Sequence, residues 1–313
     1  IGGQAVIEGI MMMKGEDYAV AVRRPDKEIE VKKDTYQSIT KKAKILQLPF
    51  VRGVFRFADS MIIGMRSLTY SASFFEDDED AEPGKFEQFL DRVFGEKLES
   101  AIMAAVLVIS FILAIGIFML LPLGIANLFK GVITSDHLMA VLEGVIRIAI
   151  FIIYIKLVSR MEDIRRTFMY HGAEHKCINC VEHGHPLTVK YVRESSKEHK
   201  RCGTSFILIV MVISILMFMV IRVDTIWMRI LSRIILVPVI AGISYEVLQC
   251  AGRSNSKFMD LVSRPGMWMQ GLTTKEPDDS MIEVAIAATE AVFDWREYLT
   301  ENFPGWEKQL EES

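Results

Sequence analysis

The stretch YHGAEHKCINCVEHGHPLTVKYVRESSKEHKRCGTSF, residues 170–206, lies between two long apolar segments and is dense in metal-binding side chains. The chain has 6 His and 4 Cys in 313 residues, and only His137 and Cys250 fall outside this stretch. Imidazole and thiolate groups gathered in this way are typical of a zinc site. We therefore expect the rest of the chain to hold this stretch at a membrane surface.

The strongest signal is the pair His171 and His175, with Glu174 between them. On a helix beginning near Asp163, residues four apart project from one face, one turn from each other. The three side chains form the pattern H-x-x-E-H, in which two His hold a zinc ion and the Glu takes a proton from water. We predict Glu174 as the catalytic residue and the two His as metal ligands.

Zinc needs three or four ligands, so the pair requires further residues. Cys180, His199 and Cys202 are the candidates that follow. Cys180 comes nine residues after His171, about two and a half helical turns, so it can share the metal only if the helix ends before it. The segment 183–186 is predicted to be a turn after such an ending. Three interpretations stay open: solvated histidines, a closed structural zinc site, or an open catalytic one.

The composition indicates a membrane protein. Hydrophobic residues make up 51% of the chain, which is high for a soluble domain. The net charge of -4 gives no reason to expect nucleic-acid binding. Four Cys in the company of His favour metal ligands or free thiols over a disulfide framework.

Residues 1–45 are predicted to form a β-rich region. The run Gln4–Met13 is expected to be one strand, and Tyr18–Arg24 with Glu28–Lys33 alternate as two strands of a hairpin. Glu8 is expected to face solvent from the first strand.

Residues 46–99 are predicted to be amphipathic helices joined by an acidic linker at 75–84. The first helix runs to about Ser71, and either the membrane interface or the core of the protein could take its apolar face. A second short helix is expected at 86–99. The apolar face of the first helix consists of Phe50, Val54, Phe57, Met61 and Met65.

The fold class predicted is a mostly α, polytopic membrane protein with about four transmembrane helices and a small α+β cytoplasmic region. Two helices are expected within 100–160, two within 204–250, and the metal-binding loop at 161–203 between them. Glu143 and Arg147 can pair within the second span, and Glu246 either reaches the interface or points at the metal. The C-terminal region, 251–313, is expected to contain a helix at 280–295 and a frayed end.

The loop between the second and third spans is rich in Lys and Arg, while the two opposite loops are poor in them. Cytoplasmic loops carry this excess of positive charge. The metal-binding loop and both termini are therefore expected on the cytoplasmic side of the membrane.

Four motifs, in order, closely resemble the bacterial DUF1385 family: IGGQAVIEG at 1–9, YHGAEHKCINC at 170–180, HKRCGTSF at 199–206 and LTTKEPDD at 272–279. The resemblance implies an integral membrane protein that has been labelled a predicted metal-dependent enzyme. It brings no established reaction or substrate. Cys177 occupies a position that varies in the family, which leaves as site residues His171, Glu174, His175, Cys180, His199 and Cys202.

Two functions follow from these observations. The first is a metal-dependent hydrolase with a cytoplasm-facing zinc site, acting on a peptide or a lipid-linked substrate. The alternative is a non-enzymatic scaffold, or a factor for the assembly or insertion of other membrane proteins, in which zinc is structural. Three protein ligands would favour the enzyme, and four would favour the structural site. The expected partners are the lipid bilayer and other membrane proteins.

Overall fold

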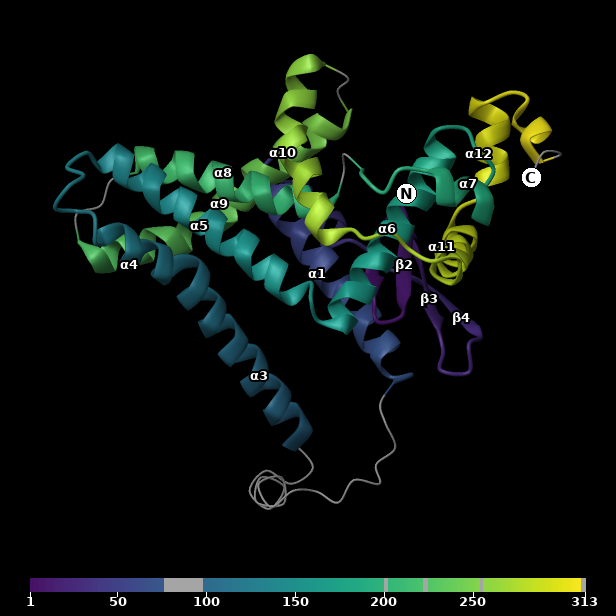
Figure 1. The fold of residues 1–313 in the computed structure, drawn as a ribbon, viewed down its shortest axis with the longest axis horizontal. Helices are drawn as coiled ribbons and strands as arrows, with labels where there is room; N and C mark the ends of the chain where they lie inside the picture. The colour runs from purple at the N-terminus through teal and green to yellow at the C-terminus, as the bar shows by residue number, and fades with distance from the viewer. Residues whose placement is uncertain (76–97, 200–201, 222–224, 254–255, 311–313) are drawn as a thin grey trace. The chain divides into compact units, whose positions relative to one another are not determined.

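The computed structural model describes residues 1–75, 98–199, 202–221, 225–253 and 256–310 (Figure 1). The chain forms two compact units, residues 1–75 with 155–313 and residues 76–154. The expected acidic linker at 75–84 and most of the expected helix at 86–99 lie outside the described residues.

The N-terminal region is a four-stranded antiparallel meander in the order β1-β2-β3-β4. The predicted hairpin is confirmed by β3 (Asp17–Arg23) and β4 (Ile29–Thr35). The single strand expected at 4–13 is wrong, because the chain folds back there into β1 (Gly2–Val6) and β2 (Gly9–Lys14). Glu8 makes this turn with a φ of 48°, in the left-handed region that non-glycine residues rarely adopt.

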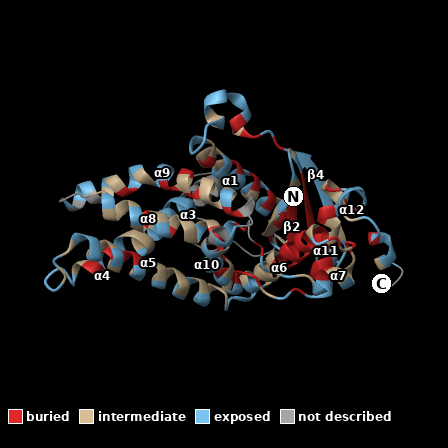
Figure 2. Ribbon diagram, turned by 90° about the horizontal axis from the view of Figure 1, so that it is seen from above, coloured by how far each residue is buried: buried red, intermediate tan, exposed pale blue. Residues whose placement is uncertain are grey.

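Both faces of the sheet are covered. Successive side chains of a strand point to opposite faces, so a strand can contribute to two cores. Ile10, Met12 and Ala21 belong to a core with α6 (Glu162–Glu182) and α11 (Asp279–Val292). The neighbouring side chains of β2 and β3 pack with Ile63 of α1 (Val51–Ala72) in a second core. Figure 2 shows the buried residues gathered on the sheet, α6 and α11.

Two short 3-10 helices, η1 (Ile39–Lys42) and η2 (Lys44–Gln47), connect the sheet to α1. Asp59 of α1 fixes this connection, because its buried carboxylate accepts hydrogen bonds from Tyr36 Oη at 2.9 Å and Ser38 Oγ at 2.5 Å. The predicted amphipathic helix is therefore confirmed in position, and its polar face is turned toward the protein.

Among the described residues, four stretches of helix are long and apolar enough to cross a membrane, as many as the sequence predicts: Ala105–Asn127, Asp136–Val158, Gly203–Val220 and Ile230–Ala251. In residues 76–154, α3 (Leu98–Ile115) passes through a π-helical turn, η4 (Gly116–Leu120), into α4 (Leu121–Asn127), and α5 begins at Asp136. Phe118 of η4 packs against Phe151 and Tyr154 of α5. Arg147 donates to Glu143 at 2.7 Å, as the spacing predicts.

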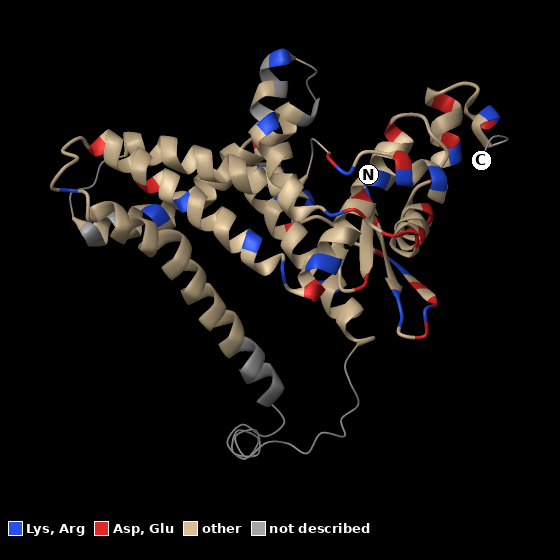
Figure 3. Cartoon of the chain, viewed as in Figure 1, with Lys and Arg blue, Asp and Glu red and all other residues tan. Residues whose placement is uncertain are grey.

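In the other unit, α8 (Gly203–Val220) and α9 (Ile226–Arg253) pack against each other. Figure 3 shows that few Lys, Arg, Asp or Glu residues lie on these two helices, whereas they are frequent on the sheet, α11 and α12 (Trp295–Asn302). This distribution is the one expected if α8 and α9 are surrounded by the hydrocarbon of a membrane and the sheet is surrounded by water.

The region after α9 is more ordered than the sequence indicated. Residues 257–273 form α10 (Lys257–Thr273), which packs on α8 and α9. The helix expected at 280–295 ends at Val292, because Asp294 caps a new helix, α12 (Trp295–Asn302), by accepting from two of its amides. The expected frayed end contains a further 3-10 turn, η5 (Trp306–Leu310), whose Trp306 packs on Trp295.

Candidate metal centre

The candidate site lies on α6, which begins at Glu162, close to the start predicted from the sequence. Its second half is buried on all sides, since every residue from Gly172 to Val181 has little or no exposed surface. Polar groups in such a helix need partners within the protein. The partners of its two histidines decide how their rings are oriented.

Both histidines use Nδ1 to bind a backbone carbonyl. His171 Nδ1 lies 3.0 Å from Thr273 O, and His175 Nδ1 lies 2.7 Å from Lys197 O. Because a carbonyl oxygen only accepts, each Nδ1 must carry the hydrogen, which leaves the lone pair of each neutral ring on Nε2. Metal-binding histidines typically have this arrangement, in which a carbonyl holds one ring nitrogen, here Nδ1, and the other is left for the metal.

Cys202 joins the pair from a different part of the chain. It is the N-cap of α8, and its Sγ accepts a hydrogen bond from Thr204 N at 3.4 Å and lies 3.3 Å from His171 Nε2. The ligand atoms of His171, His175 and Cys202 all lie within 4.8 Å of one another. Two ligands of a tetrahedral zinc are about 3.4–3.6 Å apart, given bonds of about 2.0–2.3 Å. Ligand atoms 4.8 Å apart would therefore have to approach by about 1 Å to hold the ion.

Glu174, the predicted catalytic residue, is buried under strand β1 (residues 2–6). Burial raises the pKa of its carboxyl above the ordinary value, while the nearby His171 and a hydrogen bond from the Gly3 backbone act in the opposite direction. A Cβ on Gly3 would lie 2.5 Å from Met11 O and 3.1 Å from Glu174 Cδ, so only glycine allows this approach. The N-terminal motif thus belongs to the candidate site.

Cys180 does not join the group. The helix continues past it to Glu182, and its thiol points to the other side, 3.3 Å from Pro186 O. Burial raises the pKa of this thiol to about 12. The condition under which Cys180 could share the metal is therefore not met, and the placement of Cys180 as a ligand is wrong in this geometry. The predicted turn at 183–186 is confirmed, with Gly184 at a φ of 82°.

His199 lies beside the group without entering it. Its ring centroid is 5.8 Å from that of His175, and its Nε2 lies 3.3 Å from Glu182 Oε2. Gln270 of α10 holds its backbone on both sides, accepting from His199 N at 2.9 Å and donating to His199 O at 2.8 Å. In the part of the chain that the structure describes, His199 is thus a neighbour of the three-residue group.

Buried side chains of α6 hold the end of α7 (Val189–Glu194) and the loop that follows it to residue 199, where carbonyl oxygens act as acceptors. Lys176 Nζ donates to Arg193 O and Ser195 O at 2.8 Å and pairs with Glu276. Although burial opposes it, the hydrogen bond from Lys176 holds the pKa of Glu276 below its ordinary value. Asn179 Nδ2 donates to two further carbonyls of the loop. These contacts fix the loop that supplies the carbonyl for His175.

The segment 273–276 supplies the corresponding carbonyl for His171, and sequence reasoning missed this role. It crosses α6 at Gly172, where an added Cβ would lie 2.0 Å from Lys275 O, and Lys275 N donates to Phe168 O at 2.9 Å. The only signal in the sequence was the polar motif LTTKEPDD at residues 272–279, which contains no His or Cys. The contact is made by backbone atoms.

These features define a class of protein: a helical chain with four apolar helices suited to a membrane, a small sheet, and a His/Cys group at the end of one apolar helix. The DUF1385 model, described as a protein of unknown function, matches residues 48–295, and the chain belongs to that family.

The chain is also similar to "Uncharacterized protein YqhQ" of Bacillus subtilis (strain 168), with 34% identity over 286 residues, or 91% of this chain and 89% of that protein. No solved structure matches the chain. Neither description names a reaction or a cofactor, so the metal-dependent activity implied by the resemblance stays a prediction.

Proposed function

We propose that the chain is a zinc-dependent hydrolase of the bacterial plasma membrane that acts on a peptide or lipid-linked substrate at the cytoplasmic face. The observation that carries this proposal is the group His171, His175 and Cys202, whose ligand atoms lie within 4.8 Å of one another. The fixed Nδ1 atoms of both histidines support it, because they leave both Nε2 atoms available to a metal.

Two nitrogen ligands and one sulfur ligand suit zinc better than magnesium or calcium, which prefer oxygen. When bound, zinc acts as a Lewis acid and lowers the pKa of water toward about 7. Among the described residues the group offers three ligand atoms, which is the number found in catalytic zinc sites.

Glu174 is the general base in this proposal. Burial raises the pKa of its carboxyl, and a base with a raised pKa accepts a proton from water more readily near neutral pH. The hydrogen bond from the Gly3 backbone holds the carboxylate in place. Glu174 and the two histidine ligands lie on α6, so one rigid helix positions the base together with two of the three ligands, and Cys202 comes from the start of α8.

The position of Cys202 supports a substrate at the membrane surface. It directly precedes α8, an apolar helix of 18 residues, so the group lies at the end of a candidate membrane span. Exposed basic residues near the site, such as Arg165 and Lys190, favour the cytoplasmic side for it.

A structural zinc in a membrane scaffold, or in an assembly or insertion factor, is the rival function. It requires a fourth protein ligand, and His199 is the nearest candidate that the sequence offers. Its imidazole would have to leave Glu182 to reach the metal. The number of protein ligands therefore separates the two functions.

The first experiment is elemental analysis of the purified full chain, with X-ray absorption at the zinc edge. The proposal expects one zinc, two nitrogen ligands and one sulfur ligand from the chain, and one further light atom. Cys202→Ser should lose most of the metal, whereas His199→Ala and Cys180→Ser should retain it. Loss of metal in His199→Ala, or absence of metal in the wild type, would overturn the three-ligand site.

The second experiment measures hydrolysis of a fluorogenic phospholipid and of an internally quenched transmembrane peptide in mixed micelles. Glu174→Gln should retain zinc and lose turnover by two orders of magnitude or more, the usual scale for a general base. Equal turnover in the variant, or zinc with no turnover of either probe in the wild type, would favour the structural function.

A further inference from the structure

Helix α1 (residues 51–72) exposes a row of large apolar residues and buries Asp59, Ser67 and Ser71, which is unusual for a helix on a soluble protein. Phe57, Met61, Met65 and Leu68 are 45%, 55%, 49% and 41% exposed, although they lie one turn apart on a single stripe. We call these four residues the α1 stripe. A continuous exposed stripe of this kind marks an interaction surface.

The buried face of α1 is fully occupied by its own protein. Asp59 accepts from the segment that follows the sheet, and Ser71 Oγ accepts from Ile7 N at 3.2 Å. Gln4 of β1 donates to Ser60 Oγ at 2.8 Å. Rotation of the helix to bury the stripe would break these contacts, so the exposure of the stripe is built into the fold.

The stripe is continuous with the two apolar helices of the same unit. At Gly53, an added Cβ would lie 2.7 Å from Tyr245 Cβ, and one on Gly242 would lie 2.4 Å from Phe50 O, so α1 and α9 touch through their backbones. The ring of Phe57 packs on Phe206 of α8, with centroids 5.6 Å apart. Residue 206 is near the start of α8, and residue 242 lies about halfway along the candidate span Ile230–Ala251 of α9.

The depth of this contact places the beginning of α1 within the apolar layer. Gly242 precedes Ala251, the end of the candidate span, by nine residues or about 13 Å of helix. Arg52 binds both carboxylate oxygens of Glu246 there, at 2.8 and 2.6 Å. The sequence left open whether Glu246 points at the metal group, and this pair shows that it binds the start of α1.

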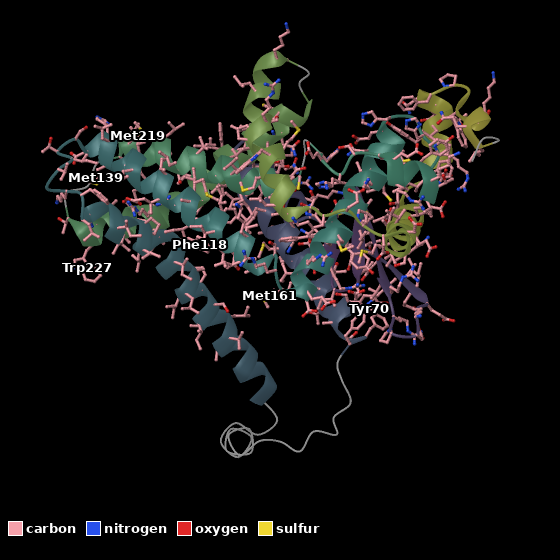
Figure 4. The ribbon with its side chains drawn as sticks, viewed as in Figure 1. Tyr70, Phe118, Met139, Met161, Met219 and Trp227 are labelled. Atoms are coloured by element: carbon pink, nitrogen blue, oxygen red, sulfur yellow. The ribbon has the colours of Figure 1, made fainter. Side chains whose placement is uncertain are left out.

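We propose that the α1 stripe binds the phospholipid bilayer, so that α1 enters the lipid beside α8 and α9 and leaves it obliquely toward the sheet. Its four charged residues disfavour a full crossing. Arg56 and Arg66 are exposed next to the stripe and can reach lipid phosphates, as cations on interfacial helices do. Tyr70, at the far end of α1, lies beside the strands (Figure 4).

This surface is coupled to the candidate metal centre through β1. Ser60 of α1 accepts from Gln4 of β1, and Ser71 of α1 accepts from Ile7 in the turn that follows β1. The same strand carries Gly3, whose backbone donates to Glu174. Lipid binding by α1 therefore sets the position of the strand that covers Glu174. The proposal itself depends only on the exposure and contacts of α1, and it stands whether or not zinc binds.

The test is nitroxide labelling of the full chain in vesicles of phosphatidylcholine and phosphatidylglycerol. Cys250, the only exposed thiol among the described residues, is replaced by Ser, and a single label is introduced at Phe57, Met61 or Met65. Lys33, exposed on β4, is the matched control position. The Cys250→Ser chain without an introduced cysteine is treated with the same label and reports any reaction of the buried thiols. Accessibility to oxygen is compared with accessibility to a water-soluble nickel chelate.

Labels on the stripe should show an oxygen-to-nickel accessibility ratio severalfold above that of Lys33→Cys. Three positions are used so that one poorly folded variant does not decide the result. High nickel accessibility at the stripe would place it in water and overturn the proposal. Low accessibility to both reagents would mean that protein covers the stripe, which would overturn it in favour of a second copy or a partner protein.

Discussion

Replacing Gly172 by alanine tests the crossing of segment 273–276 over α6, on which the orientation of His171 depends. The added Cβ would lie 2.0 Å from Lys275 O, whereas ordinary contacts begin at 3.4 Å, so the backbone must move by about 1.4 Å. That shift would also lengthen the hydrogen bond from His171 Nδ1 to Thr273 O, which is 3.0 Å in the native fold.

The expected magnitude follows from two opposing effects. Overpacking against a backbone atom costs about 3 kcal/mol, the upper part of the usual range, because no flexible side chain can yield. Alanine in place of glycine within a helix returns about 1 kcal/mol. The net loss of about 2 kcal/mol should lower the Tm by roughly 4–8 °C for a unit of this size.

The assay is thermal unfolding of the purified chain in detergent, followed by intrinsic tryptophan fluorescence. Gly271→Ala is the matched control, because the added Cβ there meets nothing within 4 Å. It should unfold at or slightly above the wild-type temperature, since only the helix-propensity gain remains. If Gly172→Ala also unfolds at or above the wild-type temperature, the close crossing at Lys275 is refuted.

Three further predictions concern contacts away from the metal ligands. Asp278 caps α11, and although burial opposes it, hydrogen bonds from Ser280 and the Met281 amide, with the charge of Arg166, lower its pKa. Its ionised form therefore stabilises the fold above the unfolded pKa of about 4, and this stability is lost as the pH falls through the lower folded pKa. Asp278→Ala should cost about 1 kcal/mol at pH 7 and flatten the acid limb of a Tm-against-pH curve, and an unchanged limb would contradict this. Arg166→Ala should cost about 1–2 kcal/mol and speed proteolysis of the N-terminal hairpin, because Arg166 binds both carboxylate oxygens of Glu8, whereas the exposed Arg165→Ala should change neither. Gln270→Ala should cost about 2–3 kcal/mol in thermal unfolding, because it leaves the backbone N–H and C=O of His199 unpaired in a buried position, and a loss below about 0.5 kcal/mol would contradict the contacts described.

Local patterns in the sequence were enough to predict the helices and one hairpin. The apolar helices were predictable because a span needs about 20 apolar residues, a property that neighbouring residues carry by themselves. The start of α6, the turn at 183–186 and the pairing of Glu143 with Arg147 likewise depend on residues close in the chain. The missed turn at Glu8 has a different cause, because a residue with positive φ other than glycine carries little local signal.

Whether a given side chain faces solvent or contacts a distant segment was decided by tertiary structure. Glu8 was expected in solvent, yet the fold brings Arg166 to its carboxylate across 158 residues of sequence. Phe57, Met61 and Met65 of the α1 stripe belong to the apolar face that the sequence predicts, but only the contacts of Asp59 and Ser71 determine that they face away from the protein.

The candidate site shows the same division. The sequence by itself determined that His171, Glu174 and His175 share a face of a helix, because helical periodicity fixes residues four apart. Which residue completes the group was undetermined among Cys180, His199 and Cys202, since that depends on where α6 ends and how the loop 193–199 returns. The structure brings in Cys202 and turns Cys180 away. The carbonyls that orient both imidazoles come from residues 197 and 273, and backbone acceptors are present at every position, so their role arises only from the packing of distant segments.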